Sequence, residues 1–268
     1  MRIPFLNPAP RVNVIRLQGA IGISSRGGGG LNDVALAPVL ERAFTKGKPK
    51  AVALAINSPG GSPVQSSLIA ARIRRLADKH EIPVHAFVED VAASGGYWLA
   101  TAADKIWADE CSVVGSIGVI SGGFGFQDFI AQHGIERRVH TAGRSKSQLD
   151  PFRPENPEDV ARLQALLDEM HQIFIAQVRS RRGSRIAADA EIFTGEFWLA
   201  RRAEALGLID GIAHMVPKMR ALYGDDLRFV SFGARRSVLR RVGLSGDVIA
   251  ADALAMIEER AAFQRFGA

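Results

Sequence analysis

Two glycine-rich turns, each placed after a buried type of apolar run, constrain the fold of this chain most strongly. The first turn is Asn-Ser-Pro-Gly-Gly at 57–61, which follows the apolar run 51–56. The second is Ala-Ala-Ser-Gly-Gly at 92–96, which comes shortly after the run 84–88. Apolar residues at helical spacing lie between the two turns, so one strand–helix unit separates them. This alternation predicts an α/β protein built from repeated strand–helix units.

The same reading along the chain gives a complete set of expected elements. Strands are expected at 12–17, 51–56, 84–88, 105–108, 118–121 and 137–142. Helices are expected at 36–44, 69–76, 95–102, 157–183 and 197–206. We predict a single domain over 1–215, followed by a helical C-terminal extension over 216–268.

Composition excludes several classes of protein. The 268 residues are 47% hydrophobic and 23% charged, which is typical of globular proteins and not of disordered ones. The single cysteine, Cys111, cannot form a disulfide within the chain. No apolar stretch has the length of a signal peptide or of a transmembrane helix, so we expect a soluble or peripheral protein of the cytoplasm.

The formal net charge of +6 raises the question of an anionic partner. The basic residues gather in short clusters, at 179–185 and 235–241, without the interleaved aromatic residues that stack on bases. We therefore predict no nucleic-acid partner. The basic tail at 232–268 would suit peripheral contact with an anionic membrane surface as well as ordinary surface packing.

Ser94 is the residue with the clearest chemical potential. A serine at a strand-to-helix turn projects from the sheet, and the backbone N–H of the next residue, Gly95, lies beside its oxygen. Gly61, on the neighbouring turn, is placed to supply the second N–H of an oxyanion hole. Taken alone, either turn is more typical of a sharp strand–helix connection that has no catalytic role.

A serine nucleophile needs a base, and none of the histidines lies in a motif. The six histidines are His80, His85, His133, His140, His171 and His214. Lys146 differs from them, because it lies in a loop of small and polar residues at 143–151 that follows an expected strand. A lysine in such a loop either reaches a site or is solvated.

Three further segments complete a pattern with the two turns and the lysine loop. They are Val-Gly-Ser-Ile-Gly-Val at 114–119, Phe-Thr-Gly-Glu at 193–196 and Leu-Gly-Leu-Ile-Asp-Gly at 206–211. In this order the motifs resemble those of the signal peptide peptidase A family of Ser-Lys peptidases, over about residues 12–212. The resemblance implies a Clp/crotonase-like superhelix of repeated ββα units.

The resemblance also implies roles for five residues. Ser94 corresponds to the family's nucleophile and Lys146 to its general base, while Gly61 and Gly95 correspond to the oxyanion donors. Ser116 corresponds to a third serine that positions the lysine amine. A lysine acts as a base only when neutral, and lowering a lysine pKa from about 10.4 to about 7–8 takes on the order of 4 kcal/mol.

The family pattern carries expectations about partners. It implies apolar peptide substrates, such as cleaved signal peptides or unfolded segments, and a homo-oligomeric ring in which the lysine meets the serine of a neighbouring subunit. It implies no cofactor, and the sequence has no Cys/His cluster with metal-binding spacing. A crotonase-type acyl-CoA enzyme and a non-catalytic peptide-binding scaffold remain the alternatives, because the same fold serves them.

Overall fold

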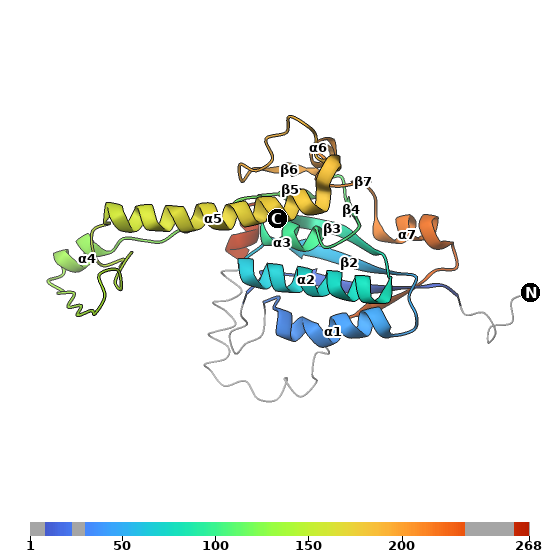
Figure 1. Cartoon of the computed structure of the whole chain (residues 1–268), viewed down its shortest axis with the longest axis horizontal. Helices are drawn as coiled ribbons and strands as arrows, with labels where there is room; N and C mark the ends of the chain where they lie inside the picture. The colour runs from blue at the N-terminus through green and yellow to red at the C-terminus, as the bar shows by residue number, and fades with distance from the viewer. Residues whose placement is uncertain (1–8, 23–29, 234–259, 268) are drawn as a thin grey trace, which may run out of the picture. The chain divides into compact units, whose positions relative to one another are not determined.

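The computed structural model describes residues 9–22, 30–233 and 260–267. The chain forms two compact units (Figure 1). Unit 1 comprises Met1–Ile117 and Gln177–Ala268, and unit 2 comprises Gly118–Ala176. Each unit is described by itself below.

Unit 1 contains every strand of the described chain and most of its helices. The strands are β1 (Arg11–Gln18), β2 (Ala51–Ser58), β3 (Val84–Ala93), β4 (Lys105–Ala108), β5 (Val113–Gly115), β6 (Phe197–Leu199), β7 (Gly211–Ile212) and β8 (Arg228–Phe232). The helices are α1 (Asp33–Thr45), α2 (Pro63–His80), α3 (Gly95–Ala100), α6 (Ala200–Ala205), α7 (Met215–Tyr223) and the 3-10 turn η1 (Gly183–Arg185). Helix α4 (Gln127–Gln132) belongs to unit 2, and α5 (Pro157–Arg182) begins in unit 2 and ends in unit 1.

The strands form one sheet in the order β6-β5-β3-β2-β1-β8, parallel except for the antiparallel pair β5–β6. Strand β3 has two different neighbours on one side. Its residues 85–88 pair with β4, and its residues 91–93 pair with β5. The sheet therefore forks in the middle of β3.

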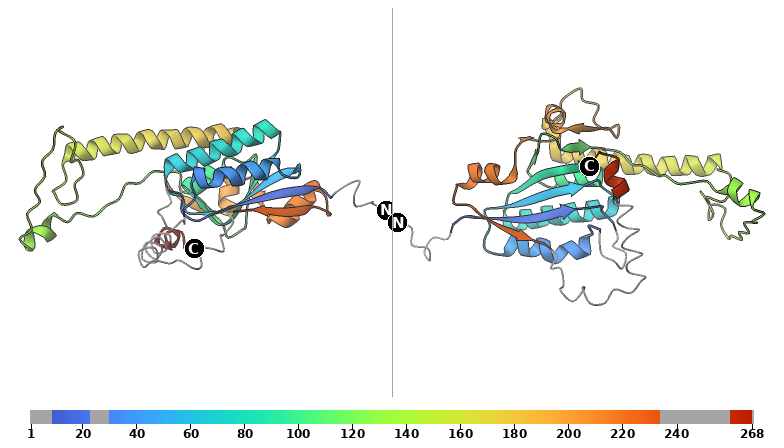
Figure 2. Two further views of the ribbon diagram at one scale, coloured as in Figure 1. Left: turned by 90° about the horizontal axis from the view of Figure 1, so that it is seen from below. Right: turned by 180° about the vertical axis from the view of Figure 1, so that it is seen from behind.

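Both faces of the sheet are covered, as the continuous apolar strand β2 requires. Every residue of β2 is buried, and its side chains alternate between the two faces. Ala53 and Ala55 pack in a cluster with Met219 of α7. The opposite face is covered by α1 and α2, which lie side by side in Figure 2. Full burial of a side chain such as Leu54 contributes about 1.5–3 kcal/mol.

Helix α2 begins directly after the first glycine turn because its start is well capped. Ser62 is the N-cap residue, and its hydroxyl accepts a hydrogen bond from the Gln65 N–H at 3.4 Å. Pro63 occupies the first helical position, where its missing N–H has no intrahelical partner to lose. The cap thus fixes where the turn ends and the helix starts.

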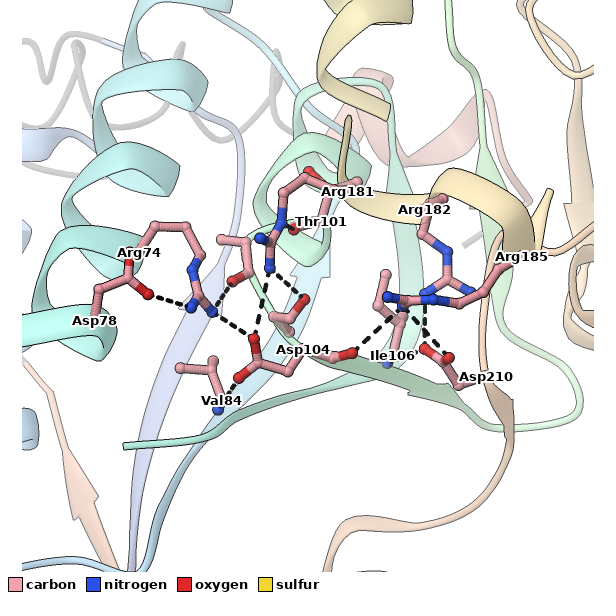
Figure 3. Close-up of polar contacts among 12 residues, drawn as sticks. Arg74, Asp78, Val84, Thr101, Asp104, Ile106, Arg181, Arg182, Arg185 and Asp210 are labelled. Carbon is pink, nitrogen blue, oxygen red and sulfur yellow. Dashed lines mark hydrogen bonds and ion pairs between the residues drawn. The ribbon is translucent and has the colours of Figure 1, made fainter. Parts of the chain in front are cut away.

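The C-terminal end of α5 is anchored in unit 1 by arginines (Figure 3). Arg181 donates to the Thr101 carbonyl at 2.8 Å, and its guanidinium also lies 3.6 Å from Asp104. Arg182, which is 2% exposed, forms an ion pair of 2.7 Å with the buried carboxylate of Asp210. Asp210 in turn accepts the backbone N–H of Ile106 in β4, at 2.8 Å.

Unit 2 leaves many apolar side chains exposed within the single chain. Its exposed large apolar residues are Ile120, Phe124, Phe126, Phe129, Ile135, Leu149, Phe152, Val160, Leu166 and Ile173. Phe126 and Phe152 stack with ring centroids 5.7 Å apart, and the Arg137 guanidinium lies over the Phe152 ring. These contacts hold the loop segments of unit 2 together but leave both rings exposed.

The α/β class and most predicted elements of unit 1 are confirmed. The predictions at 118–121 and 137–142 are wrong, because neither segment forms a strand. Both lie in unit 2, where no strand edge is available to pair with their β-branched residues. The predicted helix 197–206 begins as β6 and becomes helical only at Ala200.

The C-terminal extension, predicted to be helical over 216–268, contains a strand. After α7, the segment 228–232 forms β8 and pairs in parallel with β1. Pairing with an open sheet edge decides this conformation, which no local pattern revealed. Residues 234–259 of the extension, with most of the basic tail, lie outside the described residues.

Candidate active site

Ser94 lies between the end of β3 and the first residue of α3, in a strained backbone conformation. Its φ is +51° and its ψ is −122°, a combination that a residue with a side chain rarely adopts. Such strain persists only where the surrounding structure holds it, and it concentrates at functional sites. A sharp strand-to-helix turn with a strained serine is the geometry of a nucleophile elbow.

Glycines are required after Ser94 because other chain segments approach closely. A Cβ atom on Gly95 would lie 2.4 Å from the Ser66 hydroxyl, and one on Gly96 would lie 2.3 Å from the Ser58 carbonyl oxygen. The N–H of Gly95 belongs to the first turn of α3, whose donors have no intrahelical acceptor. This N–H therefore needs an acceptor from outside the helix.

The first glycine turn contacts the Ser94 turn directly. A Cβ atom on Gly60 would lie 2.8 Å from the Gly95 nitrogen and 2.9 Å from the Ser94 Cβ. The next residue, Gly61, pairs with Ile21 in a parallel β-bridge. The two hydrogen bonds of this bridge join Ile21 to the residues on either side of Gly61, namely Gly60 and Ser62. The N–H of Gly61 itself then points away from Ile21, as alternation in a parallel ladder requires.

Ser116 reaches the same region of unit 1 through β5. The Ser94 N–H donates to the Gly115 carbonyl at 2.8 Å, and the Ser116 N–H donates to the Glu196 carbonyl at 2.6 Å. Ser116 directly follows Gly115, the residue that Ser94 contacts. Like Ser94, it has a positive φ, of +54°. Unit 1 thus brings together Ser94, Gly95, Ser116 and the turn that contains Gly61.

Lys146 lies in unit 2 and is exposed there. Its loop turns tightly, with the Lys146 N–H donating to the Gly143 carbonyl at 3.1 Å. The pairing of Lys146 with Ser94 stays a prediction, as do the catalytic roles of Gly61, Gly95 and Ser116.

His85 is the most buried histidine of the described chain, and its contacts are structural. Its Nε2 lies 3.0 Å from the Tyr223 hydroxyl, and Trp107 Nε1 donates to its Nδ1 at 3.4 Å. Burial lowers the pKa of His85 below its ordinary value. His85 stands at the start of β3, roughly 30 Å of extended chain before Ser94.

Metal-binding clusters and membrane-spanning helices are both missing from the described ranges. Among residues 9–22, 30–233 and 260–267, no group of three or more His, Cys, Asp or Glu side chains is arranged to hold a metal ion. Within the same ranges, no helix combines the length and the apolar character needed to cross a bilayer.

Together these features define a class: Clp/crotonase-like α/β proteins in which a serine at a strained turn meets a second glycine turn. The chain belongs to peptidase family S49, whose family model matches residues 77–220, more than half of the sequence. The resemblance to the signal peptide peptidase A family is thereby confirmed.

Several named proteins are similar to this chain. A Brucella melitensis protein named Na(+)/H(+) antiporter NhaA is 46% identical over 96% of this chain and 37% of its own length. Protease 4 of Haemophilus influenzae is 31% identical over 79% of this chain and 34% of its own length. Serine protease SPPA of Arabidopsis thaliana is 32% identical, over 62% and 24% respectively. The chain thus spans about a quarter to a third of these relatives, and the antiporter name describes the longer Brucella protein.

Solved structures support the fold. The 1510-N membrane-bound stomatin-specific protease matches with a TM-score of 0.54 at 16% identity, over 85% of this chain and 99% of that structure. A second structure of that protease, in complex with a substrate peptide, matches with a TM-score of 0.53. At this identity the likeness establishes the Clp/crotonase-like α/β fold alone.

Proposed function

We propose that the chain is a serine endopeptidase that hydrolyses apolar peptides through an acyl-enzyme. Ser94 is the nucleophile and Lys146 the general base, while the N–H groups of Gly61 and Gly95 bind the oxyanion. Ser116 positions the lysine amine. The observation that carries the proposal is the strained backbone of Ser94 in direct contact with the Gly60 turn.

The chemistry follows from these groups. The neutral Lys146 amine takes the proton of the Ser94 hydroxyl as its oxygen attacks the peptide carbonyl carbon, and the two N–H groups hold the resulting oxyanion. The lysine then delivers the proton to the leaving amine, and the C–N bond breaks. Water, deprotonated by the same lysine, hydrolyses the acyl-enzyme and regenerates Ser94.

A neutral lysine base requires a desolvated amine, and Lys146 is exposed in the single chain. The charged form of the amine must be destabilised by about 4 kcal/mol, and burial against another protein surface would do this. We therefore propose that a neighbouring subunit covers Lys146, in a homo-oligomeric ring with active sites at the subunit interfaces.

The exposed apolar side chains of unit 2 support this assembly. Phe124 is 81% exposed, Ile120 72% and Ile173 61%, all in the unit that contains Lys146. Exposed large apolar side chains concentrated in one unit are what an interface with a second copy would cover. A second copy that covered it would also desolvate the lysine loop.

The substrate class rests on the relatives. They include proteins named as proteases, and the similar 1510-N protease was solved with a substrate peptide. We propose apolar peptides, such as cleaved signal peptides or unfolded protein segments, as substrates. Peripheral contact of the basic tail with a membrane would bring the enzyme to signal-peptide remnants.

Hydrolysis of a quenched apolar peptide tests the proposal. Ser94→Ala and Lys146→Ala should each lower kcat at least about 1,000-fold, because each removes a member of the catalytic dyad. The exposed residues Ser67 and Lys79 of α2 supply matched controls. Ser67→Ala and Lys79→Ala should retain wild-type rates, and a Lys146→Ala enzyme that stays active would contradict the assignment of the base.

A further inference from the structure

Strand β3 carries a bulge just before the Ser94 turn. Along the pair β2–β3, Ile56 is opposite Val88 and Ser58 is opposite Ala92. Strand β3 therefore advances four residues (92 − 88) while β2 advances two (58 − 56). Bulges of this kind re-aim the chain that follows them and occur next to active sites.

The Asn57 side chain closes this bulge. Its Nδ2 donates to Asp90 Oδ2 at 2.5 Å, and its Oδ1 accepts the backbone N–H of Val91 at 3.3 Å. The Asn57 carbonyl also accepts the Gly19 N–H from the end of β1 at 2.9 Å. Asn57 is 8% exposed, so both amide bonds are largely removed from competition with water.

The bulge coincides with the fork in the sheet. Strand β3 pairs with β4 up to Val88 and with β5 from Val91 onward. The buried Ser112 hydroxyl lies at the carbonyls of Val88 and Glu89, on the side of β5. The Asn57 hydrogen bonds therefore lie where β3 stops pairing with β4 and starts pairing with β5. The last residue of β5, Gly115, accepts the Ser94 N–H.

The Asn57 side chain lies just before both turns of the candidate site, the Gly61 turn and the Ser94 turn. Val91 precedes Ser94 by three residues (94 − 91), and Asn57 precedes Gly61 by four (61 − 57). We propose that Asn57 is a positioning residue: through Asp90 and Val91 it fixes the register between the Gly61 turn and the Ser94 turn. This inference rests on the proposed function, since it concerns how nucleophile and oxyanion donors are aligned.

Alignment of this kind affects the chemical step. Oxyanion donors act only within hydrogen-bond distance of the developing charge, and a misplacement of about 1 Å can lower the rate about 100-fold. Substrate binding along the site depends much less on it. Loss of the Asn57 bonds should therefore lower kcat and leave KM nearly unchanged.

Exchange of the two side chains gives a sharp test. Asn57→Asp places a second carboxylate against Asp90 and removes the bridging donor, so kcat should fall about 100-fold with KM within about 3-fold. Asp90→Asn retains an acceptor for Asn57 Nδ2, and its kcat should fall by at most about 5-fold. When both changes are combined, the carboxylate at position 57 can accept from the amide at position 90 and from the Val91 N–H.

The double variant Asn57→Asp/Asp90→Asn decides the question, because it restores both bonds and the net charge. Its kcat should recover to within about 5-fold of wild type, which additive effects of the two changes would not allow. Thermal unfolding of all variants identifies any that fail to fold. A folded double variant as slow as Asn57→Asp, or an Asn57→Asp enzyme with wild-type kcat, would overturn the inference.

Ser94→Ala, measured in parallel, separates this inference from the proposed function. If Ser94→Ala keeps peptidase activity, the assignment of the nucleophile fails, whatever the Asn57 variants do. If Ser94→Ala is inactive and the Asn57 variants are as fast as wild type, only the positioning role of Asn57 fails.

Discussion

The two units differ in how completely a single chain buries their apolar residues. In unit 1, every residue of β2 is buried, and the turn that carries Ser94 rests directly on this core. In unit 2, helix α4 has no buried residue, and Phe124 is 81% exposed. One chain thus completes the surroundings of Ser94 but leaves Lys146 exposed.

Glycines show the same difference at the level of the backbone. A Cβ on Gly61 would lie 2.0 Å from the Ile21 carbonyl oxygen, so neighbouring backbone fixes this turn. Gly134 and Gly143 in unit 2 also have positive φ, but a Cβ there would meet no atom within 4 Å. Neighbouring backbone therefore holds the turn that contains Gly61, whereas nothing within 4 Å restricts a side chain at Gly134 or Gly143.

Complementation between inactive variants gives the largest expected effect. Ser94→Ala and Lys146→Ala should each be nearly inactive, but subunits mixed under exchange conditions can pair an intact serine with an intact lysine from a neighbour. In a one-to-one mixture about a quarter of the interfaces would be intact, so activity should rise to about a quarter of wild type. The measurement is peptide hydrolysis before and after subunit exchange.

The matched control is a mixture of Ser94→Ala with the double variant Ser94→Ala/Lys146→Ala, which contains no intact nucleophile. It should stay inactive under the same conditions. A Ser94→Ala and Lys146→Ala mixture that stays equally inactive, with exchange verified by subunit labelling, would place the dyad within one subunit.

Polar substitution of the unit 2 surface should weaken the assembly. Phe124→Asp introduces a charge at a site that we expect a second copy to cover, and burying an unpaired carboxylate is strongly unfavourable. Activity should fall about 10- to 100-fold at low enzyme concentration as the oligomer dissociates. Light scattering with parallel assays measures both quantities.

Val34 in unit 1 is the matched control, since it is 82% exposed and lies near the start of α1. Val34→Asp should change neither mass nor activity. A Phe124→Asp enzyme that is monomeric and fully active would show that unit 2 works without a covering subunit.

The sequence was sufficient for the parts of the fold that local patterns determine. The apolar runs 51–56 and 84–88 and the helix 69–76 lie within β2, β3 and α2, because burial and capping agree there. The segments 118–121 and 137–142 have β-branched residues but no strand to pair with. Strand formation depends on a partner, which the local sequence does not supply.

The candidate site divides in the same way. Gly61, Gly95 and Ser94 were identified because a tight turn requires glycine, and the structure shows these turns in contact. The polar loop singled out Lys146 as a candidate, but its role as the base came from family resemblance, since a lysine in such a loop is also compatible with a solvated side chain. The bond between Asn57 and Asp90 was missed, because the register of neighbouring strands and its bulge are tertiary features.

Removal of the buried ion pair should destabilise unit 1. Arg182→Ala leaves the 6% exposed Asp210 carboxylate without its closest guanidinium partner, and breaking such a pair typically costs about 3–5 kcal/mol. Arg201→Ala removes an exposed pair with Glu110, and its effect should be much smaller because solvent screens that pair. Urea unfolding measures both, and equal effects would contradict the anchoring of α5 by burial.

The smallest expected effect comes from His85. Burial lowers the pKa of its imidazole below 6.5. Among the nearby charges, Lys218 and Lys105 also lower this pKa, whereas Asp104 and Asp210 raise it. Below pH 6.5 the unfolded chain therefore binds a proton that the folded chain resists. The free energy of unfolding should fall with decreasing pH, by at most about 1.4 kcal/mol per unit from this group. Urea unfolding between about pH 5 and 8 measures this slope.

His85→Gln should flatten that pH dependence, because the replacement cannot titrate, although it lowers stability at every pH by disturbing Tyr223 and Trp107. His140 in unit 2 is exposed and supplies the matched control, so His140→Gln should leave the slope as in wild type. A protonated His85 would turn a second N–H toward the Trp107 N–H, which explains why the buried ring resists the proton. A His140→Gln protein with the flattened slope would assign the pH dependence to unit 2 instead.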